Sequence, residues 1–209
     1  MIEFFYDCSS PWTYLGFESI CEIAADTGAE IAWKPILVGA VFNAVNPTVY
    51  EQRRNPIPAK QRYLVKDLMD WASYQGIAIR FPPTLFPVNS AQAMRACIVA
   101  GGHGLIVPFS RRVFQAYWGE DKNISSDDVL REIAAGVGLD ADALISSASS
   151  AELRAALRAT TDELIARGGF GSPTIFVGGS EMFFGNDRAP LIRRAVKAKM
   201  AANAQQRVL

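Results

Sequence analysis

The stretch IEFFYDCSSPWTYL at residues 2–15 decides the fold of this chain. Its first part, residues 2–6, is β-branched or aromatic at every position except Glu3, which is typical of a buried strand. Ser10 and Pro11 are residue types preferred at the N-cap and the first position of a helix. The stretch therefore predicts a strand that ends in a polar turn and leads straight into a helix.

The junction between that strand and that helix is also where we place the chemistry. Unpaired backbone N–H groups and the positive end of a helix dipole favour an anion at a helix start. The hydroxyl of Ser10 lies beside them, so the junction is suited to a thiolate or a carboxylate. Taken alone, the junction is better explained by Ser10 acting only as the helix cap.

The composition indicates a soluble globular protein whose ligand is small. The chain has 209 residues, long enough for one enlarged domain or two small ones, and 50% of them are hydrophobic. Lys plus Arg and Asp plus Glu both number 21, so the formal net charge of +0 suggests no nucleic acid and no anionic membrane surface as partner. No signal-peptide pattern and no apolar run of about 20 residues is visible, and we expect a cytoplasmic protein.

The cysteines and the histidine limit the chemistry further. Cys8, Cys21 and Cys97 are odd in number and have neither CxxC nor zinc-finger spacing, so we expect free thiols rather than a disulfide framework. Cys21 falls on the apolar stripe of the first helix and is expected to pack. His103 is the one histidine, which argues against a His-based metal site and against a Ser-His triad. We expect no bound metal.

The first half of the chain continues with alternating strand and helix. Apolar residues recur at helical spacing over residues 11–26, and Gly28 is expected to end that helix. Residues 30–36 alternate as a second strand, which we expect to pair in parallel with the first through a right-handed crossover. Asparagines and prolines without a sustained period predict a long loop at 37–59.

The second half is mainly helical until its end. Helical spacing predicts a helix at 60–75, four further helices between Asn89 and Arg167, and a short helical turn among them. Strand character returns at 174–178 and 181–184 as a hairpin, followed by a last helix that Asn186 or Asp187 can cap.

This order, β-α-β, a helical block, then β-β-α, is the thioredoxin arrangement with its halves parted by an insertion. We predict an α/β thioredoxin fold with a large all-helical insertion. The predicted parts are a discontinuous thioredoxin-like domain at 1–36 and 170–209, an inserted helical domain at 60–169, and a connecting loop at 37–59.

The segment YDCSSPWTYLGFE at 6–18 resembles the opening motif of the bacterial 2-hydroxychromene-2-carboxylate isomerases and the kappa-class glutathione transferases. These enzymes belong to the DsbA-like branch of thioredoxin folds. The resemblance covers nearly the whole chain, because it continues in order through PAKQRYLVKDL at 58–68, GSPT at 171–174 and FGNDR at 184–188. Separated motifs in the same order are far more specific than one motif alone.

The start of the helix departs from the disulfide-exchanging relatives. Where those proteins read like CPWC, this chain reads SPWT at 10–13, so both cysteine positions carry hydroxyls. Disulfide exchange needs a thiolate and a second sulfur, and this site supplies neither. The resemblance implies instead that the Ser10 hydroxyl, as the catalytic group, donates a hydrogen bond to the sulfur of bound glutathione.

The resemblance also implies which residues bind glutathione. Ser172 precedes the expected cis-proline and would pair its backbone with the cysteinyl part, as a short strand pairs with an edge. Asn186 and Asp187 would hold the γ-glutamyl end, with Asp187 pairing its ammonium group, and Lys60 would contact a carboxylate end. The expected cofactor-binding residues are Ser10, Pro11, Trp12, Asn46, Lys60, Ser172, Pro173, Asn186 and Asp187.

The loops are expected to supply the rest of the site. Asn46 resembles the asparagine of an NPP-like loop in the family, although Asn55 offers an alternative register. Phe86, Pro87 and Asn89 lie in the second proline-rich stretch, where the family lines the pocket for its aromatic substrate.

The function implied by the resemblance is a glutathione-dependent isomerase that interconverts 2-hydroxychromene-2-carboxylate and trans-o-hydroxybenzylidenepyruvate, a step of naphthalene-type catabolism. A kappa-like glutathione transferase is the first alternative. A redox-inert thioredoxin-like binding module is the second, and a residual oxidoreductase that uses Cys8 is the third. A homodimer is expected by resemblance only.

Overall fold

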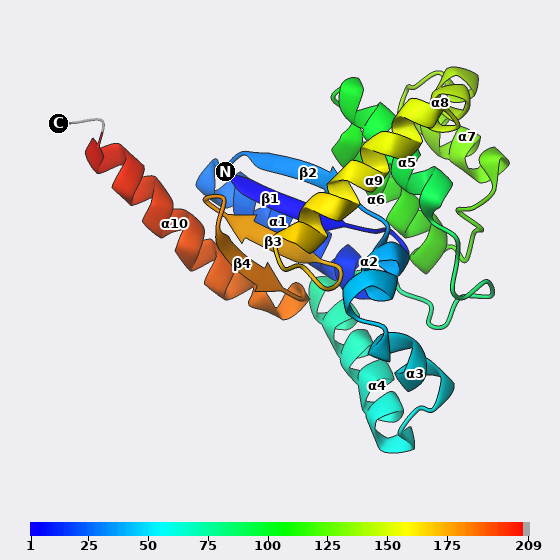
Figure 1. Ribbon diagram of the computed structural model, residues 1–209, viewed down its shortest axis with the longest axis horizontal. Helices are drawn as coiled ribbons and strands as arrows, with labels where there is room; N and C mark the ends of the chain where they lie inside the picture. Colours follow the sequence, from blue (N-terminus) through cyan, green and yellow to red (C-terminus); the bar gives the residue numbers. More distant parts are fainter. Residues whose placement is uncertain (207–209) are drawn as a thin grey trace.

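The computed structural model describes residues 1–206, and a mixed sheet lies at its centre (Figure 1). The strand order is β2-β1-β3-β4, with β1 parallel to β2 and β3 antiparallel to both β1 and β4. The predicted parallel pair, the hairpin and the thioredoxin arrangement are thereby confirmed. The strands are β1 (Ile2–Tyr6), β2 (Ile31–Pro35), β3 (Thr174–Val177) and β4 (Glu181–Phe184).

Helix α1 (Pro11–Thr27) begins and ends where its sequence predicts. The Ser10 side chain accepts a hydrogen bond from the backbone N–H of Thr13, and Pro11 occupies the first helical position. At the other end Gly28 adopts φ 71°, a left-handed conformation that glycine enters without a steric penalty, and its N–H bonds the carbonyl of Ala24. The helix therefore leaves β1 at a fixed angle.

The alternation of side chains along β1 builds a core on each face of the sheet. Phe4 and Tyr6 point to the face covered by α1, where they contact Phe17. Phe5 points to the opposite face and packs with Leu164 of α9 (Ala151–Ala166) and with Val41. Figure 1 shows α9 crossing in front of the sheet, and α10 (Ala189–Gln206) packs with α1 on the opposite face.

Most of the remaining helices form a lobe beside the sheet (Figure 1). A continuous set of buried side chains runs from β1 and α1 into this lobe and includes Met94, Phe109 and Trp118. The sheet with α1 and the helical lobe share one core, so the division into two domains stays a prediction. Helix α9, which we assigned to the insertion, covers the sheet. The lobe contains α5 (Ala91–Gly102), α6 (Ile106–Phe114) continued by the π-helical turn η1 (Gln115–Gly119), α7 (Asp127–Gly136) and α8 (Ala141–Ala148). Helix α4 (Pro58–Gln75) packs on α1 and projects away from the lobe (Figure 1).

Residues 37–59 are not the loop that we predicted. They form α2 (Val38–Val45) and α3 (Thr48–Arg54), and α4 begins at Pro58. The asparagines and prolines that suggested a loop stand at the helix boundaries, where they favour starts and ends: Asn46 and Asn55 end α2 and α3, and Pro47 precedes α3. The prediction was wrong because each helix is too short to show a sustained period.

Among the helices of residues 1–206, none has the length and apolar character that a membrane-spanning segment requires. The proline-rich stretch at 80–89 is irregular, as predicted.

An ion pair on the α9 face joins the sheet to the end of that helix. Arg167 Nη2 lies 2.8 Å from Glu3 Oε2, and its guanidinium stacks 3.8 Å from the centroid of Phe176. Glu3 is 8% exposed, so its charge depends on this partner. The hydrogen bond from Arg167 is the main cause that holds the pKa of Glu3 below its usual range.

We expect Arg167→Ala to lower the free energy of unfolding by roughly 3 kcal/mol at pH 7, because it leaves a nearly buried carboxylate unpaired. The pKa of Glu3 is lowered in the folded chain, so its stabilising contribution is present above its unfolded pKa of about 4.3 and is lost as the pH falls through the folded value. The cost should therefore shrink in acid. Urea unfolding at pH 7 and pH 3 measures it, with Arg167→Lys as the control that keeps the charge. A cost that grows in acid would contradict this account.

Candidate functional site

Ser10 stands at the junction of β1 and α1, as predicted, and its hydroxyl has two contacts. Ser10 Oγ accepts from the N–H of Thr13 at 3.3 Å and donates to the carbonyl of Ser172 at 3.4 Å. The second contact is long and the side chain is only half-buried, so the hydroxyl can turn toward a ligand. Ser10 thus both caps the helix and faces the loop before β3.

The loop before β3 brings Ser172 and Pro173 against the start of α1. The Ser172–Pro173 peptide bond is cis, as expected. Ser172 Oγ lies 2.7 Å from Thr13 Oγ1 and accepts from the N–H of Asp7 at 3.0 Å. Pro173 is seated on Gly16 so closely that a Cβ there would lie 3.0 Å from the ring. A larger residue at Gly16 would therefore crowd the ring of Pro173.

The fully buried carboxylate of Asp7 supports the site. Its Oδ1 accepts from the N–H of Ser9 at 2.9 Å, and its Oδ2 accepts from the N–H of Val38 at 2.9 Å and from Ser90 Oγ at 3.0 Å. Burial raises the pKa of Asp7, although these hydrogen bonds act in the opposite direction. One side chain thus holds the ends of β1, α2 and α5 together under Ser10.

Cys8 points into the core and not toward the site. The side chain is 0% exposed, and the neighbouring backbone is held by Met94 Sδ on the N–H and by Trp118 Nε1 on the carbonyl, at 3.3 and 2.9 Å. Burial raises the pKa of the Cys8 thiol well above its ordinary value. Packing explains this cysteine, as it explains Cys21, which packs against the same core.

Asn186 and Asp187 follow β4 in the short 3-10 turn η2 (Asn186–Arg188). Asn186 is 6% exposed, and within residues 1–206 its amide Nδ2 has no hydrogen-bond partner although it is buried. Its backbone lies 3.8 Å from the Cβ position of Gly16, beside Pro173. A buried N–H group of this kind calls for an acceptor. Asp187 is half-exposed and is paired with Arg188 at 2.7 Å.

Lys60 and Trp12 line an open groove of about 550 Å³ between the first turns of α1 and α4. Pro11, the residue before Trp12, is buried. The other lining residues are Ala59, Tyr63, Leu64 and Asp67. The lining is mainly apolar, and Lys60 is its basic group.

The structure distinguishes the two candidate asparagines. Asn46 Nδ2 donates to the carbonyl of Phe170 at 3.2 Å, so the residue reaches the segment that leads to Ser172. Asn55 ends α3 instead. Asn46 is therefore the asparagine that contacts the loop of the site.

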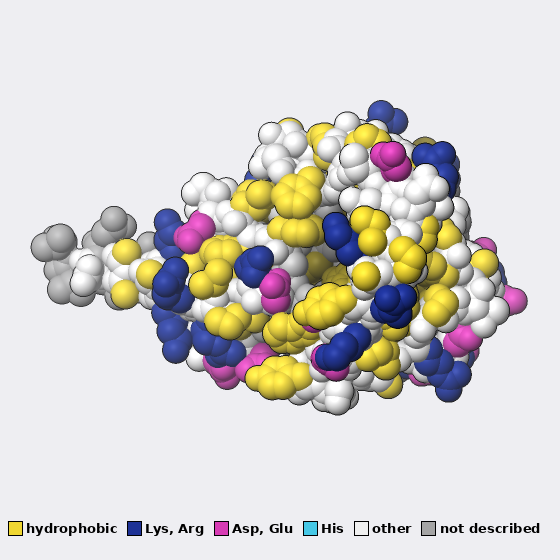
Figure 2. Space-filling view, turned by 90° about the horizontal axis from the view of Figure 1, so that it is seen from below, with side chains coloured by type: hydrophobic (Ala, Val, Ile, Leu, Met, Phe, Trp, Pro, Cys, Tyr) yellow, Lys and Arg dark blue, Asp and Glu magenta, His cyan; other side chains and the backbone are white. Residues whose placement is uncertain are grey.

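The proline-rich stretch at 80–89 contributes an apolar wall. Phe86 is 38% exposed and packs edge-on against Phe81 and Trp118, and its peptide bond to Pro87 is cis. Asn89 Oδ1 accepts from the N–H of Ala91, so that side chain supports the start of α5. Figure 2 shows hydrophobic side chains around a central hollow on the face that carries α3 and α4, with basic side chains among them.

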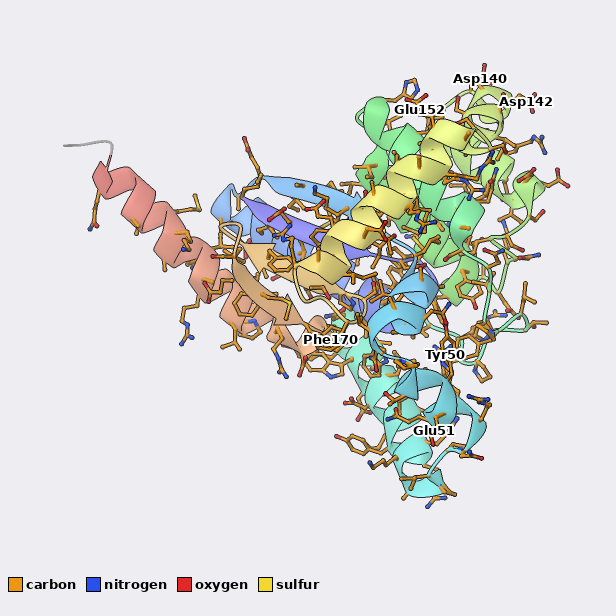
Figure 3. The ribbon with its side chains drawn as sticks, viewed as in Figure 1. Tyr50, Glu51, Asp140, Asp142, Glu152 and Phe170 are labelled. Atoms are coloured by element: carbon orange, nitrogen blue, oxygen red, sulfur yellow. The ribbon has the colours of Figure 1, made fainter. Side chains whose placement is uncertain are left out.

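Three residues that we did not predict support the site. Thr13 was detectable, because it fills the second cysteine position on the same helix, and it holds Ser172 in place. Ser90 and Trp118 reach Asp7 and the carbonyl of Cys8 from the helical lobe, and no local pattern reveals either contact. None of the described residues forms a cluster suited to a metal ion. The acidic residues Asp140, Asp142 and Glu152 gather at the opposite end of the lobe (Figure 3).

The comparisons with known proteins agree with this geometry. A model described as "DSBA-like thioredoxin domain" matches residues 1–197. "Glutathione s-transferase kappa 2" of Caenorhabditis elegans is 29% identical over 205 residues, which cover 92% of this chain and 89% of that protein. A "2-hydroxychromene-2-carboxylate isomerase" of Pseudomonas putida is 28% identical and is covered to 98%, as is this chain.

A solved structure of 2-hydroxychromene-2-carboxylate isomerase superposes with a TM-score of 0.84 at 27% identity and covers 98% of both chains. This chain belongs to the DsbA-like thioredoxin domain family, and the relatives named above are enzymes. The expected resemblance is confirmed.

The buried carboxylate predicts a pH dependence of stability. The pKa of Asp7 is raised in the folded chain, so its contribution is fully present below the unfolded pKa of about 3.9 and is lost as the pH rises through the folded value. We therefore expect the difference in unfolding free energy, wild type minus Asp7→Asn, to fall as the pH rises. Chemical unfolding at a series of pH values measures it.

Ser90→Ala provides the second variant for that series. It removes a hydrogen bond that lowers the pKa of Asp7, so the fall should move to higher pH. A difference that rises with pH, or a Ser90→Ala curve shifted to lower pH, would refute the role given to burial.

Proposed function

We propose that this protein is a glutathione-dependent isomerase that interconverts 2-hydroxychromene-2-carboxylate and trans-o-hydroxybenzylidenepyruvate. The observation that carries the proposal is the pair of hydroxyls, Ser10 and Thr13, at the helix start where disulfide-exchanging relatives carry sulfur. The similarity to isomerases of that name over 98% of the chain supports the same reaction. Naphthalene-type catabolism is the proposed setting.

The residues of the site fit glutathione. The buried amide Nδ2 of Asn186 lacks a partner among the described residues and would donate to the γ-glutamyl end. Asp187 would pair with the ammonium group there, and Lys60 with a carboxylate end. The backbone of Ser172 beside Pro173 would pair with the cysteinyl part, between Pro11 and Trp12 on one side and Asn46 on the other.

When bound, glutathione would supply a thiolate that adds reversibly to the conjugated double bond of the substrate and so permits rotation. The protein must keep that sulfur ionised. A thiol with pKa about 8.5 needs a shift of about two units, roughly 2.7 kcal/mol, to be mostly ionised at neutral pH. A hydrogen bond from Ser10 to a charged acceptor contributes roughly 1.5 to 3 kcal/mol, and the start of α1 up to about 1.

The other residues of the site would position the ligands and shield them from water. Thr13 is fully buried and bonded to Ser172, so it fixes the loop before β3 and leaves Ser10 as the hydroxyl that faces the ligand. Phe86 and Pro87 would form the apolar wall against the aromatic ring, which excludes water. Asn89 would act through the position of α5.

A kappa-like glutathione transferase is the alternative, because the relative of that class from Caenorhabditis elegans is as similar as the isomerases. It would use the same thiolate site but keep the bond to an electrophile. An assay of trans-o-hydroxybenzylidenepyruvate absorbance with and without glutathione, beside chlorodinitrobenzene conjugation, separates the two. Equilibration that does not depend on glutathione would remove the isomerase proposal.

The two alternatives that are neither an isomerase nor a glutathione transferase make different predictions. A redox-inert binding module would lose no catalysis when Ser10 is replaced. An oxidoreductase based on Cys8 would lose disulfide transfer in Cys8→Ser, but the full burial of that thiol speaks against it.

We expect Ser10→Ala to lower kcat/KM for isomerisation about 100-fold, as the loss of one donor to a developing anion does in other enzymes. It should also cost about 1 kcal/mol of stability, because the cap of α1 is lost. Ser150→Ala is the matched control. Ser150 caps α9 by accepting a hydrogen bond from the N–H of Leu153 at 3.1 Å, and it is far from Ser10 in the sequence. Equal activities of the two variants would exclude a catalytic Ser10.

We also propose a cytoplasmic homodimer. All three cysteines lie within the described residues and are free, which suits a reducing compartment. Met69 and Tyr74 expose 42% and 83% of their surface on α4, which supports an interface on that projecting helix (Figure 1). Sedimentation should give twice the mass of the 22.8 kDa chain, and Met69→Glu with Tyr74→Glu should give the monomer mass. A wild type that sediments as a monomer would exclude the dimer.

A further inference from the structure

Arg53 lies on α3 with its guanidinium over two aromatic rings. Its Cζ atom is 5.8 Å from the ring centroid of Phe42 and 5.8 Å from that of Phe86. Phe42 belongs to α2, whereas Phe86 belongs to the proline-rich loop, so one exposed side chain bridges two separate elements. The two cation–π contacts favour a position of this long side chain between the rings.

The two rings flank the candidate site. Phe42 lies 3.7 Å from the Cβ position of Gly171, the residue before Ser172. On the other side Phe86 packs edge-on against Trp118 at 6.4 Å. Trp118 in turn donates to the carbonyl of Cys8, three residues before the first residue of α1. Arg53 therefore spans the space between the two walls of the site.

Helix α3 is held rigidly enough to place this side chain. Tyr50 lies beside α2, as Figure 3 shows, and its hydroxyl donates to the carbonyl of Gly39 at 3.2 Å. The Tyr50 ring also meets Phe42 edge-on at 6.3 Å. Arg53 follows Tyr50 by three residues and so lies on a neighbouring part of the same helix face.

Among the residues that the structure describes, Arg53 has no carboxylate partner. Over residues 1–206, no carboxylate lies within 4.0 Å of its guanidinium. Stacking occupies the faces of a guanidinium but leaves the N–H groups at its edge available, and their planar fork matches a carboxylate. The neighbouring Arg54 differs, because its Nε donates to the carbonyl of Tyr50.

We propose that Arg53 binds the carboxylate of the second substrate and selects conjugated aromatic acids over neutral analogues. The inference rests on the proposed function for the identity of that substrate. The aromatic walls would hold the ring of the acid while the guanidinium pairs with its charge. Lys60, in the groove beside Trp12, is then left for glutathione, so the two basic residues recognise different molecules.

Binding of trans-cinnamate, followed by quenching of tryptophan fluorescence without glutathione, tests the proposal. We expect Arg53→Gln to raise the dissociation constant about tenfold, the effect of losing one charge-assisted hydrogen bond. Cinnamyl alcohol, which has the same ring and no charge, should bind wild type and variant alike. Arg54→Gln, the matched control, removes the same charge from the same helix and should leave both affinities unchanged.

Kinetics provide the second readout. In the isomerisation assay Arg53→Gln should raise KM for trans-o-hydroxybenzylidenepyruvate about tenfold with a smaller change in kcat, and Arg53→Lys should recover part of the loss. The ultraviolet absorbance of the glutathione thiolate in the complex should stay as in wild type. That readout separates this proposal from the proposed role of Ser10.

Equal weakening of cinnamate and cinnamyl alcohol in Arg53→Gln would overturn the proposal, since it would show that the arginine only supports the aromatic walls. The same loss in Arg54→Gln would overturn it too, because bulk charge would then explain the effect. A wild type that does not prefer the acid would also refute it. A selective loss of cinnamate in a protein without isomerase activity would support Arg53 while the proposed function fails.

Discussion

The buried carboxylate of Asp7 is the interaction on which the rest of the site depends. It accepts hydrogen bonds from the turn after β1, from the first residue of α2 and from the residue before α5. Its own backbone N–H bonds Ser172, so the loop before β3 is joined to the same point. A charge without a cation beside it tolerates burial only if its lone pairs are used, and here distant segments of the chain supply the donors.

The hydrogen bonds around Asp7 divide the residues at the start of α1 into those that set positions and one whose hydroxyl is left for a ligand. Thr13 and Ser172 use their hydroxyls on each other, and Asp7 uses its oxygens on two backbone N–H groups and the Ser90 hydroxyl, so these groups set positions. Ser10 keeps a weakly engaged hydroxyl at the surface of the same assembly. The disulfide-exchanging members of the fold carry sulfur at this position, whereas this chain keeps the strand-to-helix geometry with hydroxyls in place of both sulfurs.

The sequence predicted well what local pattern determines. The β1–α1 junction, the helix end at Gly28 and the β3–β4 hairpin depend on neighbouring residues, and they are found as predicted. The helices α2 and α3 were missed because each spans about two turns. Contacts such as Ser90 with Asp7, or Arg53 with Phe42 and Phe86, join segments that no local period relates, so only the folded chain shows them.

The register of the sheet has a consequence for biosynthesis. Strand β1 lies between β2 and β3, yet Ile2 pairs with Val177, near the other end of the chain. A ribosome that has delivered the first β-α-β unit must still make the whole helical lobe before the second neighbour of β1 exists. Until then the nascent chain carries an apolar strand with an open edge, which invites association with other chains. Folding should therefore finish late, after translation of β3, and should be slow for a protein of this size.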